Sequence, residues 1–290
     1  MNLPQYAPLE ERLGESSCIL PADGIRRNVK SACRRRLPGL QWIPRHDGTF
    51  VVCAGGPSLR RELLAIRHHV SRGDTIVAIN ATSEFLFERG IIPTLCVLLD
   101  PQPLLADQFL ADPAIEYLVA SQCHPVVFDK LRDAGCNVYL WHSDSDNARL
   151  VRRYERDPIF LPPRGSTAAL KCFDLGYILG YRDIQFYGLD SSFEAAENGD
   201  LRHHAYAQAV DDGPEIIEIK VKGADHERSF ITRVDYVHQA KEFIDIHNVY
   251  ARQSEARQIE PTSIAVHGDG LIPYLWKKGI FNGGHDFLQG

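Results

Sequence analysis

The sequence predicts an α/β fold: a Rossmann-like, doubly wound, mainly parallel sheet with helices on both faces. Between residues 50 and 190, short apolar runs alternate with segments whose apolar residues have helical spacing. Glycines stand at the ends of several of these helical segments, so the connections between elements are short. Repeated alternation of strand and helix with short connections is typical of a parallel sheet covered by helices.

The expected elements follow in order along the chain. Residues 1–48 are rich in Pro, Gly and Arg and are interpreted as an N-terminal arm with one helix near 23–36. Strands are expected at 50–54, 75–79, 94–99, 117–120, 137–141 and 184–187. Helices are expected from Pro57 through 60–67, at 83–89 and 128–134, and, as an amphipathic helix, at 167–179.

The chain changes character after Asp190. Residues 191–232 are polar, with one alternating stretch at 215–221 that predicts a β-ribbon over the candidate ligand site described below. A long helix is expected at 233–256, followed by a loop that contains His267. The predicted division of the chain is an N-terminal arm (1–48), a nucleotide-binding domain (49–206), and a lid with a C-terminal helical extension (207–290).

Composition describes an ordinary globular protein of 290 residues, 44% hydrophobic and 24% charged, with enough apolar residues for a large core. The formal charge of −6 disfavours a general nucleic-acid binder, and the basic cluster between Arg26 and Arg36 is interpreted as a solvated helix face rather than a polyanion site. No apolar stretch approaches the roughly 20 residues that span a bilayer.

Cysteine usage bears on the compartment. The seven cysteines include no CxxC pair, and most are expected to be buried thiols rather than ligands or disulfides. No signal peptide is evident, so we expect a cytoplasmic protein.

The most informative segment is the turn Gly55-Gly56-Pro57-Ser58, which follows the apolar run 50–54. Glycines lack Cβ atoms, so the chain can turn sharply there or a ligand can approach the backbone. A glycine-rich turn from strand to helix directs free backbone N–H groups and the positive end of the helix at one point, which favours a phosphate. Two interpretations stay open at this stage, a nucleotide-phosphate site and an ordinary tight turn.

Polar residues also stand at other strand ends and helix starts. They are Asn80, Asp100, the segment Gly165-Ser166-Thr167, and Gly188 with Asp190. In a doubly wound sheet these positions meet at the carboxyl edge, so we expect one ligand site, although each residue alone is also explained as a cap or turn residue. The segment 165–167 is a second candidate for holding a phosphate or a ribose.

Motif spacing disfavours two classes of nucleotide enzyme. Neither glycine segment is followed by Gly-Lys-Ser/Thr, which disfavours a P-loop kinase. The third glycine of the dinucleotide fingerprint is missing, which disfavours a standard NAD enzyme.

Four side chains are candidates for chemistry. Asp100 and Asp190 are candidate Mg²⁺ ligands beside phosphates, with helix capping or ribose binding as alternatives. His204 and His267 are candidate general acids or bases, because imidazole titrates near neutral pH; exposed loop histidines are the alternative. Asp190, which follows a predicted strand, is also a candidate catalytic residue.

In their order along the chain, several segments resemble the bacterial motility accessory factor (Maf) and archaeal MptE-like family. They are Val51–Ser58, Ala78–Asn80, Arg89–Thr94 leading to Leu99-Asp-Pro-Gln102, Gly165–Thr167, Gly180–Ile184 and Gly188–Asp190. The same segments resemble bacterial sialyltransferases, in which a Gly-Pro-Ser-Leu turn and a Ser-Gly-containing helix start hold a CMP-sugar. The resemblance covers about 50–206. It implies nucleotide contacts from Gly56, Ser58, Asn80 and Ser166, with Gly188 and Asp190 nearby.

The resemblance implies two chemistries. In the first, a glycosyltransferase moves a nonulosonic sugar from a CMP donor to a hydroxyl acceptor, with His204 or His267 deprotonating that hydroxyl. In the second, a diphosphokinase acts on 6-hydroxymethyl-7,8-dihydropterin with ATP and Mg²⁺, the metal being held by Asp100 and Asp190. We favour sugar transfer, because residues 180–190 look most like those of sialyltransferases.

A third hypothesis is a nucleotide-binding regulator without turnover. Under all three hypotheses the expected partners are small molecules, a nucleotide and, for the enzymes, a hydroxyl acceptor. No covalently bound cofactor and no nucleic acid are expected, and a homo-oligomer is compatible with the sequence.

Overall fold

The computed structural model describes residues 20–143, 147–195, 200–202, 204–206, 216–222 and 227–279. Residues 1–19 of the predicted arm, the first residues of the predicted lid (207–215) and the last residues (280–290) lie outside this description, and Cys18 is among them.

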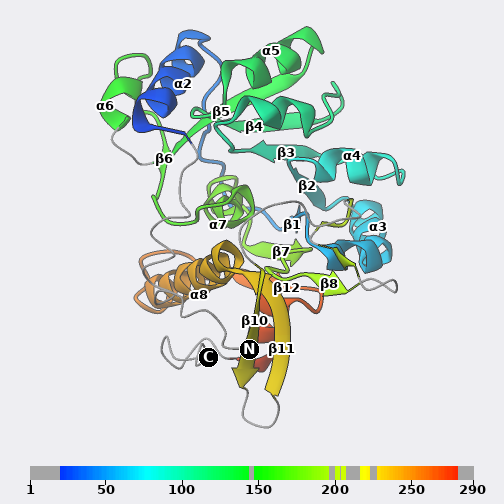
Figure 1. Ribbon diagram of the computed structural model, residues 1–290. Helices are drawn as coiled ribbons and strands as arrows, with labels where there is room; N and C mark the ends of the chain where they lie inside the picture. The colour runs from blue at the N-terminus through cyan, green and yellow to red at the C-terminus, as the bar shows by residue number, and fades with distance from the viewer. Residues whose placement is uncertain are drawn as a thin grey trace.

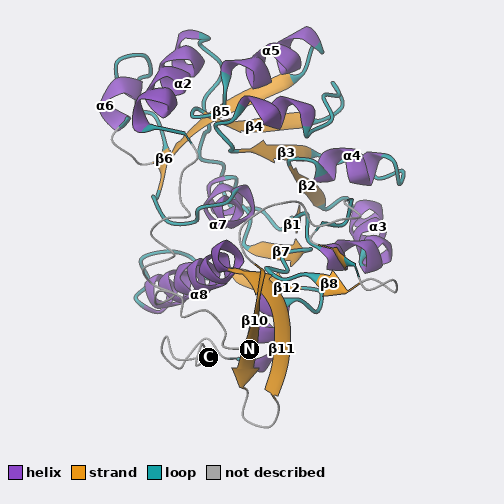
Figure 2. Ribbon diagram, viewed as in Figure 1, coloured by secondary structure: helices purple, strands orange, loops and turns teal. Residues whose placement is uncertain are grey.

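Within the described residues, eight strands form one sheet in the order β12-β7-β1-β2-β3-β4-β5-β6, and every neighbouring pair is parallel (Figures 1 and 2). The strands are β1 (Thr49–Cys53), β2 (Thr75–Ile79), β3 (Leu95–Leu98), β4 (Glu116–Ala120), β5 (Asn137–Ser143), β6 (Phe160–Leu161), β7 (Asp183–Tyr187) and β12 (Ser263–Val266). Their continuous apolar composition follows from burial on both faces. The predicted Rossmann-like fold is confirmed.

Helices lie around this sheet. They are α2 (Ala22–Arg34), α3 (Leu63–Arg72), α4 (Thr82–Phe87), α5 (Pro125–Asp133), α6 (Ala148–Val151), α7 (Ala168–Ile178), α8 (Val234–Glu255) and α9 (Leu271–Lys278), with 3-10 helices η1 (Pro57–Arg61) and η2 (Pro103–Asp107). The helix expected from Pro57 is therefore two helices, because the backbone leaves helical geometry at Glu62 (φ −95°, ψ 1°).

Helix α7 differs from the amphipathic helix that was expected. Ten of its eleven residues are buried, because β1, β3 and β6 lie on one side and α8 on another. The Phe173 ring on α7 lies 4.9 Å from that of Phe186 on β7 and 5.4 Å from that of Phe243 on α8. This central helix thus joins the sheet to the C-terminal helix.

The predicted β-ribbon exists, but it does not cover the candidate ligand site. Strands β10 (Ile216–Lys222) and β11 (Glu227–Arg233) form an antiparallel hairpin that projects from the sheet near α8 (Figure 1). A second, shorter pair is β8 (Glu194–Ala195) with β9 (Leu201–Arg202). The second strand of the hairpin ends at Arg233 and leads directly into the first turn of α8.

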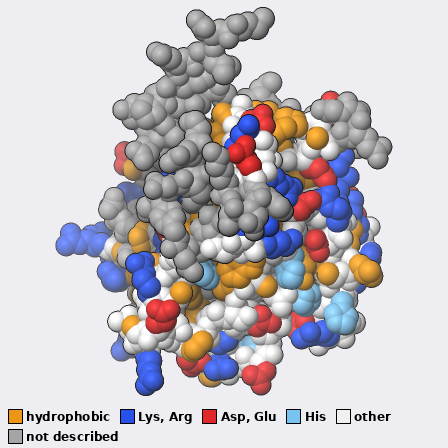
Figure 3. Space-filling view, turned by 90° about the horizontal axis from the view of Figure 1, so that it is seen from below, with side chains coloured by type: hydrophobic (Ala, Val, Ile, Leu, Met, Phe, Trp, Pro, Cys, Tyr) orange, Lys and Arg blue, Asp and Glu red, His pale blue; other side chains and the backbone are white. Residues whose placement is uncertain are grey.

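The distribution of surface charges and the state of the cysteines agree with what the sequence predicted. Acidic and basic side chains are interspersed on the face seen in Figure 3. None of the described helices has both the length and the apolar composition that crossing a membrane requires. All described cysteines are free thiols, buried at positions 33, 53, 96, 123 and 172 and half-buried at 136.

Candidate functional site

The main candidate site is a pocket of about 420 Å³ at the carboxyl edge of the sheet. Its floor includes residues 54–56, which follow β1, and residues 188–192, which follow β7. From β1 the chain builds the sheet outward in one direction through β6 and then returns to place β7 on the other side of β1. Ligands of open α/β sheets bind at such a point, where the strand order reverses.

Many of the side chains predicted from sequence line this one pocket. Those it brings together are Gly55, Gly56, Asn80, Ser166, Thr167, Gly188, Asp190 and His204. Pro57, Ser58, Gly165, Asp100 and His267 do not line it. The convergence of strand ends therefore occurs as expected, while the roles assigned to these residues stay predictions.

Two residues of the pocket have strained backbones. Asn80 has φ +49° and Ser191 has φ +50°, in the left-handed region that non-glycine residues rarely adopt. The Asn80 Oδ1 atom is buried and has no hydrogen-bond partner within the described residues. Arg36, Asp157 and Arg257, which lie outside the pocket, have the same conformation, so the backbone alone does not mark the site.

Two of the three N–H groups of the Gly55–Ser58 turn are bonded within the protein, although free N–H groups were expected there. The Gly56 N–H donates to the Gly188 carbonyl at 2.7 Å, and the Ser58 N–H donates to the Asp190 carboxylate at 2.7 Å. A Cβ atom on Gly56 would lie 2.5 Å from the Gly188 oxygen, so glycine is required there by the approach of the two strand ends. The helix that follows is the five-residue η1, which is a weak source of helix dipole.

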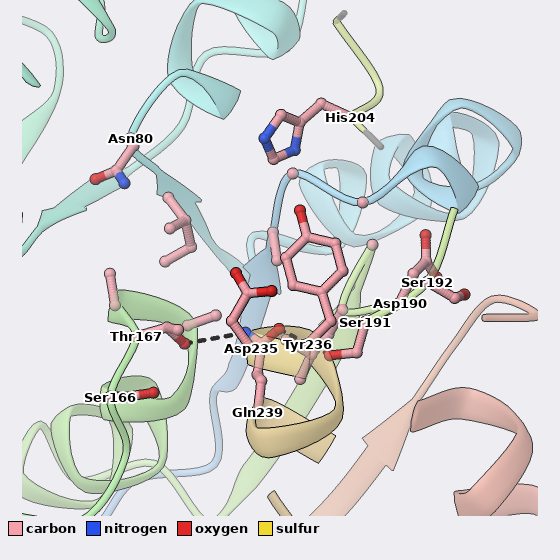
Figure 4. A pocket seen from close by; sticks show the side chains of 18 of the residues that line it. Asn80, Ser166, Thr167, Asp190, Ser191, Ser192, His204, Asp235, Tyr236 and Gln239 are labelled. Atoms are coloured by element: carbon pink, nitrogen blue, oxygen red, sulfur yellow. Dashed lines mark hydrogen bonds between the residues drawn. The ribbon is translucent and has the colours of Figure 1, made fainter. Parts of the chain in front are cut away.

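In the second glycine segment, residues 165–167, the polar groups of Ser166 are also bonded to a carboxylate of the protein. The Ser166 N–H lies 3.1 Å from both Glu242 carboxylate oxygens, and the Ser166 hydroxyl donates to the same carboxylate. Thr167 caps α7, since its hydroxyl oxygen accepts from the Leu170 N–H, and it also accepts from Gln239 Nε2 at 3.1 Å (Figure 4). Both predicted phosphate cradles thus hold a carboxylate of the protein itself.

His204 projects into the pocket opposite α8 (Figure 4). Its ring stacks on Tyr206 with centroids 4.9 Å apart. The segment 204–206 is fastened to the glycine turn, because the Ala205 N–H donates to the Gly55 carbonyl at 2.8 Å and Arg60 Nε donates to the Ala205 carbonyl. A Cβ atom on Gly55 would lie 3.0 Å from the Tyr206 hydroxyl, so this glycine makes room for the segment 204–206.

His267 lies elsewhere, which corrects its expected place in the site. It follows β12, stacks on Tyr187 with centroids 4.2 Å apart, and lies 3.2 Å from Gln185 Oε1. Burial lowers its pKa, and the neighbouring His69 and Lys277 act in the same direction. Tyr187 in turn meets His69 Nε2 at 3.0 Å, so His267 belongs to a cluster beside β7 rather than to the pocket.

Asp190 is buried, with its carboxylate also accepting the Ser58 hydroxyl at 2.7 Å. Burial raises its pKa to about 6, although both hydrogen bonds from Ser58 oppose the shift. Asp100 accepts the Gln102 N–H at 2.8 Å, which is the turn interaction named above as an alternative. Strands β7 and β3 are separated by β1 and β2 and are about 14 Å apart at the usual strand spacing. Asp190 lines the pocket and Asp100 does not, so the structure does not bring the two carboxylates together as a pair of ligands for one Mg²⁺ ion.

Helix α8 supplies side chains that the sequence did not indicate. Asp235, Tyr236, His238 and Gln239 from its first turns line the pocket, and Asp235 and Tyr236 rise from the helix toward the side of His204 (Figure 4). The Asp235 carboxylate is paired with Arg233 at 2.7 Å. The sequence of a long helix does not indicate which of its turns lies beside a strand end more than forty residues away. These four residues could therefore not be predicted from the sequence.

Two solved structures are similar to this chain. A Maf glycosyltransferase from Magnetospirillum magneticum AMB-1 is similar in structure, with a TM-score of 0.55 and 15% identity over 89% of this chain and 41% of that chain. A mammalian sialyltransferase in complex with Gal-beta-1-3GalNAc-ortho-nitrophenol has a TM-score of 0.37 and 11% identity, over 91% of this chain and 85% of that chain. This chain therefore spans less than half the length of the Maf enzyme, and that likeness shows the fold.

Among curated proteins no match is found. The family described as 6-hydroxymethylpterin diphosphokinase MptE-like matches residues 25–196, more than half of the chain. This match confirms the resemblance that the sequence segments between β1 and Asp190 indicated. The chain belongs to the MptE-like family.

Proposed function

We propose that this protein is a nucleotide-dependent transferase that moves a nonulosonic sugar from a CMP donor to a hydroxyl acceptor. The observation that carries the proposal is the pocket at the point where the strand order reverses, which is lined by His204 and by Asn80, whose buried Oδ1 atom has no hydrogen-bond partner within the described residues. Its volume of about 420 Å³ lies within the usual range for small-molecule sites.

The charge of the lining favours a donor with a single phosphate. The lining residues within the described chain offer hydroxyls, amides, imidazoles and a phenol, and none of them is Lys or Arg. Their carboxylates are engaged inside the protein, Asp190 with Ser58 and Asp235 with Arg233. Such groups suit a base, a ribose and one phosphate, whereas a triphosphate requires cations to neutralise its charge.

His204 is the proposed general base. In the transfer step the acceptor oxygen forms a bond to the anomeric carbon of the sugar, and its proton passes to a ring nitrogen of His204. The bond between that carbon and the phosphate oxygen breaks, and CMP leaves with the electron pair. Polar groups line the pocket, the Asn80 amide among them, and we expect them to bind the departing nucleotide.

The alternative is a Mg²⁺- and ATP-dependent 6-hydroxymethylpterin diphosphokinase, which the family description favours. The pair Asp100 and Asp190 does not fit a shared Mg²⁺ ion, because only Asp190 lines the pocket. Under this alternative the metal ligands would have to come from other residues. A regulator without turnover would bind the nucleotide in the same pocket and would not consume it.

Calorimetric titration with CMP and with ATP, each with and without Mg²⁺, tests the proposal. We expect CMP to bind without metal. Asn80→Asp should weaken this binding about tenfold or more, since a carboxylate would replace an amide donor beside a phosphate. Asn137→Asp, the same change at an exposed site on β5, is the control and should bind as the wild type does. Binding of ATP only with Mg²⁺, with no affinity for CMP, would overturn the proposal in favour of the kinase.

A further inference from the structure

Outside the pocket, three side chains that commonly bind metals meet between the far edge of the sheet and α2. Cys33 lies in the last turn of α2, His142 lies on β5, and Glu155 lies in the turn after α6. One ligand atom from each lies within 4.8 Å of the other two. None of the three lines the candidate site, so the cluster is independent of the proposed function.

The cluster is buried and its polar atoms are incompletely paired. The Cys33 and His142 side chains are each 2% exposed, and Glu155 is 20% exposed. His142 Nε2 lies 3.0 Å from a Glu155 carboxylate oxygen, while His142 Nδ1 is buried without a hydrogen-bond partner within the described chain. A buried nitrogen left unpaired in this way is costly and calls for an explanation.

We propose that Cys33, His142 and Glu155 bind a divalent transition metal of the zinc class. Thiolate, imidazole and carboxylate together are a ligand set of Zn²⁺, and three protein ligands leave the fourth tetrahedral position for water or another molecule. Thiolate disfavours Mg²⁺ and Ca²⁺, which prefer oxygen ligands. With bonds of 2.0–2.3 Å, the ligand atoms around zinc lie about 3.5 Å apart, so contraction of the cluster by about 1 Å suffices.

Charge supports the same assignment. The deprotonated Cys33 and Glu155 together carry two negative charges, which one divalent cation neutralises.

The position of the cluster indicates what the metal would stabilise. The Glu155 carboxylate lies close to Gly39, where the chain pairs with Leu140 of β5. A bound ion would therefore join α2, β5 and the turn after α6 at one point. Helices α2 and α6 also meet through a small separate core of Val29, Cys33, Leu150 and Val151.

Cobalt binding to the whole protein, after removal of metals with a chelator, tests the proposal. Co²⁺ bound by a thiolate gives a near-ultraviolet charge-transfer band, which we expect in the wild type and in the control Cys136→Ser, whose cysteine lies outside the cluster. Cys33→Ser should abolish the band. Added Zn²⁺ should displace the cobalt and raise the melting temperature of the chelator-treated wild type.

Glu155→Gln is the second variant, because it keeps a hydrogen-bonding partner for His142 and should fold even if Cys33→Ser does not. We expect this variant to bind Zn²⁺ about tenfold or more weakly in competition with a chromophoric chelator. Loss of a residue that only hydrogen-bonds to a metal-binding side chain already weakens metal affinity by that much. No cobalt band in the wild type, an unchanged band in Cys33→Ser, or unchanged affinity in Glu155→Gln would overturn the proposal.

Discussion

At the scale of single residues, Asp190 is defined by its burial against Ser58. Its raised pKa, about 6, means that the folded protein holds a proton in a pH range where the unfolded chain has already lost it. Between about pH 4 and pH 6 the folded state binds more protons, so this residue's contribution to the free energy of unfolding falls as the pH rises. Below that range both states are protonated, and above it the loss is complete.

Asp190→Asn should therefore remove part of the pH dependence of stability. The amide is isosteric, and its oxygen and NH₂ can meet the Ser58 N–H and hydroxyl. We expect the wild type to lose stability relative to this variant as the pH rises from 4 to 6 in urea unfolding. If the difference between the two proteins does not change over this range, the assigned protonation of Asp190 is wrong.

The two candidate histidines are separated by their surroundings. Each stacks on a tyrosine, so a phenylalanine can replace either ring and keep the stacking. His204→Phe should lower the rate of CMP release from a CMP-sugar about 100-fold or more, because a general base contributes on that order. His267→Phe should leave the rate near that of the wild type. A loss of equal size in both variants would contradict the placement of the base.

At the scale of elements, strands were well predicted and their surroundings were not. Runs such as Ile76–Ile79 are apolar throughout, and so short an apolar run favours a strand buried on both faces. The two-residue β6 and the edge strand β12 carry too little pattern to detect. Helix α7 appeared amphipathic because Lys171 and Asp174 are polar, yet both are buried, with Lys171 bonded to the carbonyls of Pro162 and Arg164.

Phe173 tests the role of α7 as the link between sheet and α8. Its fully buried ring packs against β7 and α8, so Phe173→Ala should lower the free energy of unfolding by about 3–5 kcal/mol. Leu64→Ala on α3 is the control, because that side chain is 80% exposed and its loss should cost under about 0.5 kcal/mol. Similar costs in urea unfolding would show that α7 is not a central packing element.

At the scale of the whole molecule, stability should differ between the sheet and the projecting hairpin. Strand β1 is paired on both sides, whereas β10 pairs only with β11 in a separate two-stranded sheet. Isolated hairpins are marginally stable. Hydrogen exchange should therefore be faster at 216–222 than at 49–53. Equal protection would mean that the hairpin opens only with the entire fold.

The candidate site shows where sequence reasoning ends. Strand ends such as Gly55, Asn80 and Gly188 could be gathered into one site because a parallel sheet has only one carboxyl edge. The carboxylate of Glu242 at Ser166, and the contribution of α8, depend on the packing of segments about seventy residues apart. The Cys33, His142 and Glu155 cluster spans even more of the chain, and no spacing motif records it.

The internal bonding of the glycine turn has a consequence for ligand affinity. Because Gly188 and Asp190 already hold the Gly56 and Ser58 N–H groups, the turn keeps its shape without help from a bound molecule. The entropy of ordering this backbone is lost when the protein folds, so association does not incur it a second time. The turn is preorganised, so the affinity of the proposed ligand should reflect the contacts that it makes rather than the cost of shaping this backbone around it.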